Sequence, residues 1–152
     1  MQKNERMIHY YKASCSRDNL KLIRKFVEAV LFEMPLGDIE TNQLILAVDE
    51  VCANQIIHTY KCNPTKSIEI IIRDEAPNLV FEIINEDGSH FDLTGYQDPS
   101  LQNIVKERRK GGIGLMLVHK IMDKVEVDQQ ESKCTWRLVK KINPKVDIKA
   151  NC

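Results

Sequence analysis

Three polar residues that can do chemistry stand four residues apart near the middle of the chain: Glu50, Asn54 and His58. Residues at this spacing lie on one face of a helix. A carboxylate can accept a proton, and a carboxamide oxygen is a suitable neutral ligand for magnesium, which otherwise keeps its waters and phosphate oxygens. The spacing predicts a polar stripe that meets a hydrated metal ion and a nucleotide phosphate. A solvated stripe without function has the same pattern, and we expect His58 to close the stripe structurally, without a catalytic role.

A second polar cluster, Glu86-Asp87-Gly88, follows an apolar run that alternates like a strand. A carboxylate at a strand end can accept a hydrogen bond from the exocyclic amine of adenine, and the glycine lets a ring approach the backbone. The same residues are also typical of an ordinary turn.

A third cluster opens a predicted helix, and its residues are Lys110, Gly111, Gly112, Ile113, Gly114 and Leu115. Free backbone N–H groups at a helix start bind phosphate, with help from the helix dipole. Upstream cations at Lys106, Arg108 and Arg109 add positive charge. A basic helix ended by glycine is the alternative. The cluster is neither a dinucleotide fingerprint nor a P-loop, because their later glycine and lysine are missing.

The elements that must position these clusters follow from hydrophobic periodicity. A first helix carries an apolar face from Leu20 to Leu31, and Ser14 or Ser16 is expected to cap it. Asp38 opens a second helix that runs to about Tyr60. Its apolar side is expected to contain Leu44, Ala47, Val48 and Val51.

Strands are predicted over residues 67–74 and 79–84 as a hairpin, and over 124–128 and 135–139 as a second pair. A third helix covers 113–122, and a loop over 92–110 contains a short helix at 100–108. This order predicts an α+β fold, a two-layer sandwich whose mixed, mostly antiparallel sheet has helices on one face.

Composition favours one domain over residues 1–142, followed by a polar tail over 143–152, in a chain of 152 residues. Lysine plus arginine equals aspartate plus glutamate, 22 each, so direct binding to nucleic acid or to a membrane surface is not expected. No apolar run is long enough to span a bilayer, and the polar start lacks a signal-peptide core, which favours the cytoplasm. Five cysteines without a Cys-x-x-Cys pair predict reduced thiols.

Together the three clusters resemble the motifs of the GHKL (Bergerat-fold) ATPases, and most closely those of bacterial anti-sigma-factor serine/threonine kinases. The likeness runs from about Ile8 to Val139. Residues 46–60 resemble the N box of that family, and residues 88–92 resemble its first glycine box. Residues 111–115, with the helix to 125, resemble its second glycine box.

This resemblance implies an ATP-binding fold in which Asn54 holds Mg²⁺ and Glu50 is the catalytic base. Gly88, Gly112 and Gly114 would shape the nucleotide pocket, together with their neighbours Lys110, Gly111, Ile113 and Leu115. It implies a kinase that binds a sigma factor or phosphorylates a STAS-domain anti-anti-sigma protein, and a homodimer. The family has aspartate where this chain has Glu86, so Glu86 contacts adenine, or Asp87 does, or nucleotide affinity is reduced, and we favour Glu86.

Two other functions fit parts of the pattern. The glutamate at position 86 also suits a nucleotide-gated, or nucleotide-independent, protein-binding module without phosphotransfer. The catalytic domain of a two-component histidine kinase is less favoured, because the sequence shows no preceding phosphoacceptor hairpin and the first helix is expected to be integral to the fold.

Overall fold

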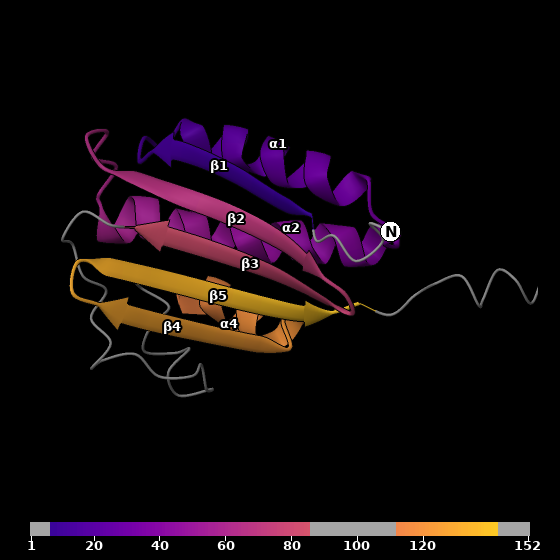
Figure 1. The fold of residues 1–152 in the computed structure, drawn as a ribbon. Coiled ribbons are helices and arrows are strands. Elements are labelled where there is room, and N and C mark those ends of the chain that lie inside the picture. Colours follow the sequence, from indigo (N-terminus) through magenta and orange to yellow (C-terminus); the bar gives the residue numbers. More distant parts are fainter. Residues whose placement is uncertain (1–6, 86–111, 143–152) are drawn as a thin grey trace, which may run out of the picture.

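A five-stranded sheet has the helices packed on one of its faces (Figure 1). The computed structural model describes residues 7–85 and 112–142. The elements in chain order are β1 (Ile8–Ser14), α1 (Asn19–Phe32), α2 (Asp38–Ala53), a π-helix (Asn54–Thr59), β2 (Ser67–Glu75), β3 (Asn78–Asn85), α4 (Gly112–Ile121), β4 (Lys124–Gln130) and β5 (Lys133–Lys141). The predicted two-layer α+β sandwich is therefore confirmed.

The strands lie in the order β1-β2-β3-β5-β4, and each neighbouring pair is antiparallel. Both predicted hairpins, β2–β3 and β4–β5, form. The expectation of a mixed sheet was wrong for the described strands, because no strand pairs with a parallel neighbour there. Short hairpin turns force the β2–β3 and β4–β5 pairs to be antiparallel, and the β1–β2 and β3–β5 pairs, which are joined by longer connections, are antiparallel as well.

The core lies between the sheet and the helix layer. Ile68, Ile70 and Ile72 alternate along β2 and are fully buried, as the period of two predicts. On α2 the predicted apolar side is confirmed, because Leu44, Ala47, Val48 and Val51 are each at most 1% exposed. Helix α2 contacts both α1 and α4, so it lies at the centre of the helix layer and can bring its polar stripe to α4.

Strand β1 was not predicted. It pairs with β2 along its whole length, and one of its faces is exposed at Ile8, Tyr10 and Lys12. An edge strand of this kind has no clean apolar alternation for sequence analysis to detect. Its inner face packs on α1, where the rings of Tyr11 and Phe26 stack with centroids 5.1 Å apart.

The first helix begins later than predicted. Neither Ser14 nor Ser16 caps α1, because the helix starts at Asn19. Ser16 Oγ instead accepts a hydrogen bond from the Asp18 N–H at 3.3 Å, in a local turn that competes with helical capping. The second helix also differs, since it ends as an α-helix at Ala53 and continues as a π-helix to Thr59.

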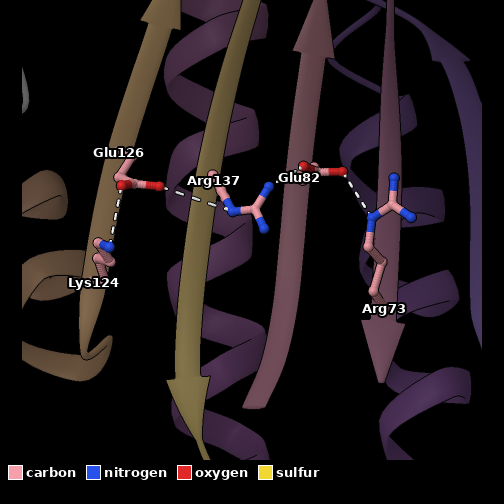
Figure 2. A network of polar contacts seen from close by, with 5 residues as sticks. All are labelled: Arg73, Glu82, Lys124, Glu126 and Arg137. Atoms are coloured by element: carbon pink, nitrogen blue, oxygen red, sulfur yellow. Dashed lines mark hydrogen bonds and ion pairs between the residues drawn. The ribbon is translucent and has the colours of Figure 1, made fainter. Parts of the chain in front are cut away.

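A chain of charged side chains crosses the sheet (Figure 2). Glu82 on β3 is only 8% exposed, and it accepts hydrogen bonds from Arg73 Nε at 3.1 Å and Arg137 Nη1 at 2.8 Å. Arg137 also approaches Glu126, which pairs with Lys124 at 3.3 Å. Burial of a carboxylate is costly unless it is paired, so the two arginines explain how Glu82 can sit in the central strand.

We expect Glu82→Ala to lower the free energy of unfolding by about 2 kcal/mol, because the loss of this carboxylate removes two charge-assisted hydrogen bonds. Glu126→Ala is the matched control, since Glu126 pairs at the exposed end of the same chain and should cost less than about 1 kcal/mol. Urea denaturation of both variants measures the difference. Equal losses would show that burial of Glu82 does not strengthen its pairing.

Several predictions lie outside the described residues, namely the short helix at 100–108, the loop around it and the tail at 143–152. Within the described part, Cys15, Cys52, Cys62 and Cys134 form no disulfide. No described helix is both long and apolar enough to cross a bilayer.

Candidate functional site

Glu50 and Asn54 lie one helical turn apart at the end of α2. The Asn54 N–H donates to the Glu50 carbonyl, and both side chains are half-buried. The first two members of the predicted stripe therefore share a face. His58 is exposed and belongs to the π-helix, in which the Tyr60 N–H bonds the Gln55 carbonyl five residues back at 2.9 Å. The predicted α-helix therefore continues here as a π-helix, and the predicted alignment of His58 with the stripe stays a prediction.

The start of α4 meets the carboxylate of Glu50. A Cβ atom built on Gly114 would overlap Glu50 Oε1 and would lie 2.9 Å from Glu50 Cδ. A side chain at position 114 therefore cannot coexist with the present position of Glu50. The absence of a Cβ lets the first turn of α4 approach α2 closely. Glu50 of the first cluster and Gly114 of the third, which are 64 positions apart in the sequence, are thus brought together.

The environment of Glu50 makes its carboxylate more basic. Partial burial raises the pKa of the Glu50 carboxyl above its ordinary value, and the neighbouring negative charge of Asp49 raises it further. Asp49 itself pairs with Arg24 of α1, with Oδ2 accepting from Nη2 at 2.8 Å. A carboxylate with a raised pKa holds an abstracted proton better than an ordinary glutamate.

Two buried carboxamides that sequence reasoning missed stand behind Asn54. Gln55 is fully buried and Asn85 is 2% exposed. Asn85 Nδ2 donates to Gln55 Oε1 at 2.7 Å, and Gln55 Nε2 donates to Asn54 Oδ1 at 3.3 Å. The sequence held a signal for both, because Gln55 stands four residues after Val51 on the core side of the helix, and Asn85 stands two residues after Ile83 on the core side of β3.

The far end of this carboxamide chain carries an acceptor without a partner. Asn85 Oδ1 is buried and makes no hydrogen bond. A buried polar atom left unpaired costs about 1–3 kcal/mol, so such atoms are rare in native proteins and often mark a functional position. Asn85 is the last residue of β3 and directly precedes Glu86, the start of the second cluster.

These observations fit a magnesium nucleotide. The first turn of α4 offers backbone N–H groups, with glycine where the turn meets Glu50 of α2, which suits phosphate. Asn54 Oδ1 uses one lone pair for Gln55, and a carbonyl oxygen has a second, which suits magnesium. Asn85 Oδ1 is free to accept from a donor on a ligand.

The structure places only part of the predicted site. Gly112 and Ile113 form the beginning of α4, and Gly114 and Leu115 follow in the same helix as half-buried residues. The remaining predicted residues lie outside the described ranges: Glu86, Asp87, Gly88, Lys110 and Gly111. The choice between Glu86 and Asp87 as the adenine contact stays a prediction.

Comparison with known proteins extends the family resemblance of the sequence motifs over most of the chain. A model of the histidine kinase-like ATPase domain matches residues 14–140. The serine-protein kinase RsbW of Bacillus pumilus is 32% identical over 127 residues, which cover 80% of this chain and 78% of that protein. The RsbW of Bacillus subtilis is 30% identical over 143 residues, with 87% and 84% covered.

Solved structures share the fold. A Mycobacterium tuberculosis protein with RsbU and RsbW domains superposes with a TM-score of 0.63 at 12% identity, over 89% of this chain and 32% of that one. The SiaB–SiaC complex of Pseudomonas aeruginosa gives a TM-score of 0.60 at 13% identity, with 93% of each chain covered. With its motifs, its helix-on-sheet architecture and its relatives in agreement, this chain belongs to the histidine kinase-like ATPase family, among the relatives of the RsbW serine-protein kinases.

Proposed function

We propose that this protein is an ATP- and magnesium-dependent protein serine/threonine kinase that acts in a partner switch. In this switch it binds a sigma factor, or it phosphorylates a small STAS-domain protein that opposes it. Its relatives are named as serine-protein kinases, and one of its structural neighbours is a two-protein complex. A cytoplasmic homodimer with no direct contact to nucleic acid or membrane is part of the proposal.

One observation carries the kinase proposal, namely the close approach of Gly114 to the Glu50 carboxylate. This approach puts a helix start suited to phosphate beside a carboxylate with a raised pKa. Asn54, a suitable magnesium ligand, is one turn further along α2. Phosphoryl transfer relies mainly on positioning and charge neutralisation, and these groups supply both from two packed helices.

In the proposed reaction Glu50 accepts the proton of the substrate hydroxyl. As that oxygen bonds to the γ-phosphorus, the bond from phosphorus to the β–γ bridging oxygen breaks and ADP leaves. Backbone N–H groups at the start of α4, around Gly112 and Gly114, hold the phosphate oxygens. Asn54 would hold magnesium, which supplies charge neutralisation when bound. The proposed nucleotide pocket is completed by Gly88, Lys110, Gly111, Ile113 and Leu115. The proposed contact to adenine is Glu86.

The direct test combines the purified protein with γ-labelled ATP, magnesium and the STAS protein encoded beside it. We expect label on a serine or threonine of the STAS protein, and no transfer when EDTA replaces magnesium. Pull-down of a sigma factor with and without the STAS protein tests the switch, since the two partners should compete.

The alternative is a binding module without phosphotransfer, and the glutamate at position 86 is the reason to consider it. Calorimetry with a non-hydrolysable ATP analogue distinguishes the two. Magnesium-dependent nucleotide binding without label on the STAS protein would favour a nucleotide-gated module. Sigma-factor binding by a chain that binds no nucleotide would favour a nucleotide-independent module and would overturn the proposed site.

A further inference from the structure

The three linked carboxamides form a chain with one direction. Asn85 donates to Gln55, and Gln55 donates to the oxygen of Asn54, over 2.7 Å and 3.3 Å. Each carboxamide has one donor end and one acceptor end. If one member turned over, donor would face donor or acceptor would face acceptor at its junctions. The orientation of the Asn54 side chain is therefore coupled to that of Asn85 through Gln55.

Burial makes this coupling strong. Gln55 is fully enclosed and Asn85 nearly so, so water cannot substitute for the partner that either residue would lose. Asn54 is half-buried and lies at the junction of α2 and the π-helix, so burial restricts its side chain less than it restricts Gln55 or Asn85. Gln55 and Asn85, which burial holds in place, lie in the core. Asn54, which is less enclosed, lies at the proposed magnesium site.

We propose that Gln55 and Asn85 are positioning residues that hold the Asn54 oxygen in the orientation needed for magnesium–nucleotide binding. The inference rests on the proposed function. Partners that orient a metal ligand from behind tune metal affinity in many proteins. Here the hydrogen bond from Gln55 fixes the orientation of the Asn54 amide, with its oxygen toward Gln55. The second lone pair of that oxygen remains available for the ion.

The test measures how much magnesium strengthens nucleotide binding. Calorimetry with a non-hydrolysable ATP analogue is run in magnesium and in EDTA, and the ratio of the two Kd values is the magnesium enhancement. We expect Gln55→Met, which keeps the length of the side chain without its polar ends, to reduce this ratio about tenfold. Affinity in EDTA should stay unchanged, because the variant leaves the phosphate and base contacts in place.

A second variant guards against a simple loss of folding. Gln55→Met alone leaves Asn85 with a buried unpaired donor. The double variant Gln55→Met/Asn85→Leu removes both partners, a change that is close to neutral for stability in apolar surroundings. We expect its Tm to lie above that of Gln55→Met, while its magnesium enhancement stays equally reduced.

The matched control is Thr41→Val, which removes a partly buried side-chain hydrogen bond of α2, from Thr41 Oγ1 to the Gly37 carbonyl at 2.8 Å. It should lower Tm and leave the magnesium enhancement unchanged. If the double variant folds and keeps the wild-type enhancement, or if it loses affinity equally in magnesium and in EDTA, the positioning role is wrong while the proposed function stands. A wild-type chain without any magnesium enhancement would overturn the proposed function and this inference together.

Discussion

Replacement of Glu50 by glutamine is expected to lower kcat about 10²- to 10⁴-fold, the usual contribution of a positioned general base. The amide has nearly the shape of the carboxylate, so the affinity for the magnesium nucleotide should remain. The measurement is phosphate transfer to the STAS protein at saturating ATP, with Kd from calorimetry. Glu40→Gln, on the first turn of the same helix, is the control and should retain full activity.

The pH profile gives a second reading of the same residue. Glu50 must be ionised to accept a proton, so kcat/KM should rise with pH as the carboxyl loses its proton. Because burial and Asp49 raise its pKa, the midpoint should lie above the ordinary value of 4.5. Asp49→Asn removes the negative neighbour and should move the midpoint to lower pH. A midpoint that stays unchanged would argue that another group limits the rate.

The raised pKa also has a cost in stability. In the folded protein Glu50 keeps its proton to higher pH than in the unfolded chain, so the folded state binds more protons in that interval and stability falls as pH rises through it. The glutamine variant lacks this titration. It should therefore be at least as stable as the wild type at neutral pH, which thermal unfolding checks, and a loss of activity cannot then be assigned to unfolding.

The second large effect is expected from Gly114→Ala. The new Cβ atom would overlap the end of the Glu50 side chain, which is flexible and can turn away, so the fold should survive. Alanine also favours helix over glycine by about 1 kcal/mol. Misplacement of a catalytic group by about 1 Å can cost roughly 10²-fold in rate, so we expect a stable protein with kcat lowered by about that factor.

A double variant shows whether the loss acts through Glu50. If Gly114→Ala harms catalysis by displacing the carboxylate, it should add little to the loss in a Glu50→Gln background. Lys120→Ala, at an exposed position of the same helix, controls for a general effect of substitutions in α4. Additive losses in the double variant would mean that Gly114 acts separately, through phosphate binding.

Much of the fold could be predicted because its inner elements carry strong periodic patterns. The alternating isoleucines of β2 and the apolar side of α2 each identify an element with one buried face. Strand β1 could not be predicted, since an edge strand exposes Ile8 and Tyr10 and its pairing depends on β2, which is far away in the sequence. The antiparallel character of the whole sheet also depends on the β3–β5 pairing, which no local pattern encodes.

The site was predicted in part for a similar reason. The pairing of Glu50 with Asn54 follows from local spacing, and the approach of Gly114 required only that the two motifs meet. The π-helical form of residues 54–59 could not be predicted, because a π-turn depends on backbone hydrogen bonds that residue types do not specify. Gln55 was missed because it was read as part of the motif over residues 46–60, and Asn85 because it falls between the predicted strand over 79–84 and the cluster that begins at Glu86.

The π-helix that follows α2 has the geometry of an α-helix into which one residue has been inserted. A π-turn contains one residue more than an α-turn, and His58 within this segment is exposed. In a chain one residue shorter at that point, the Gln55 carbonyl and the Tyr60 N–H could still bond, now as the closure of an ordinary α-turn. Natural or engineered variants that are one residue shorter between Gln55 and Tyr60 should therefore keep both ends of the segment in place.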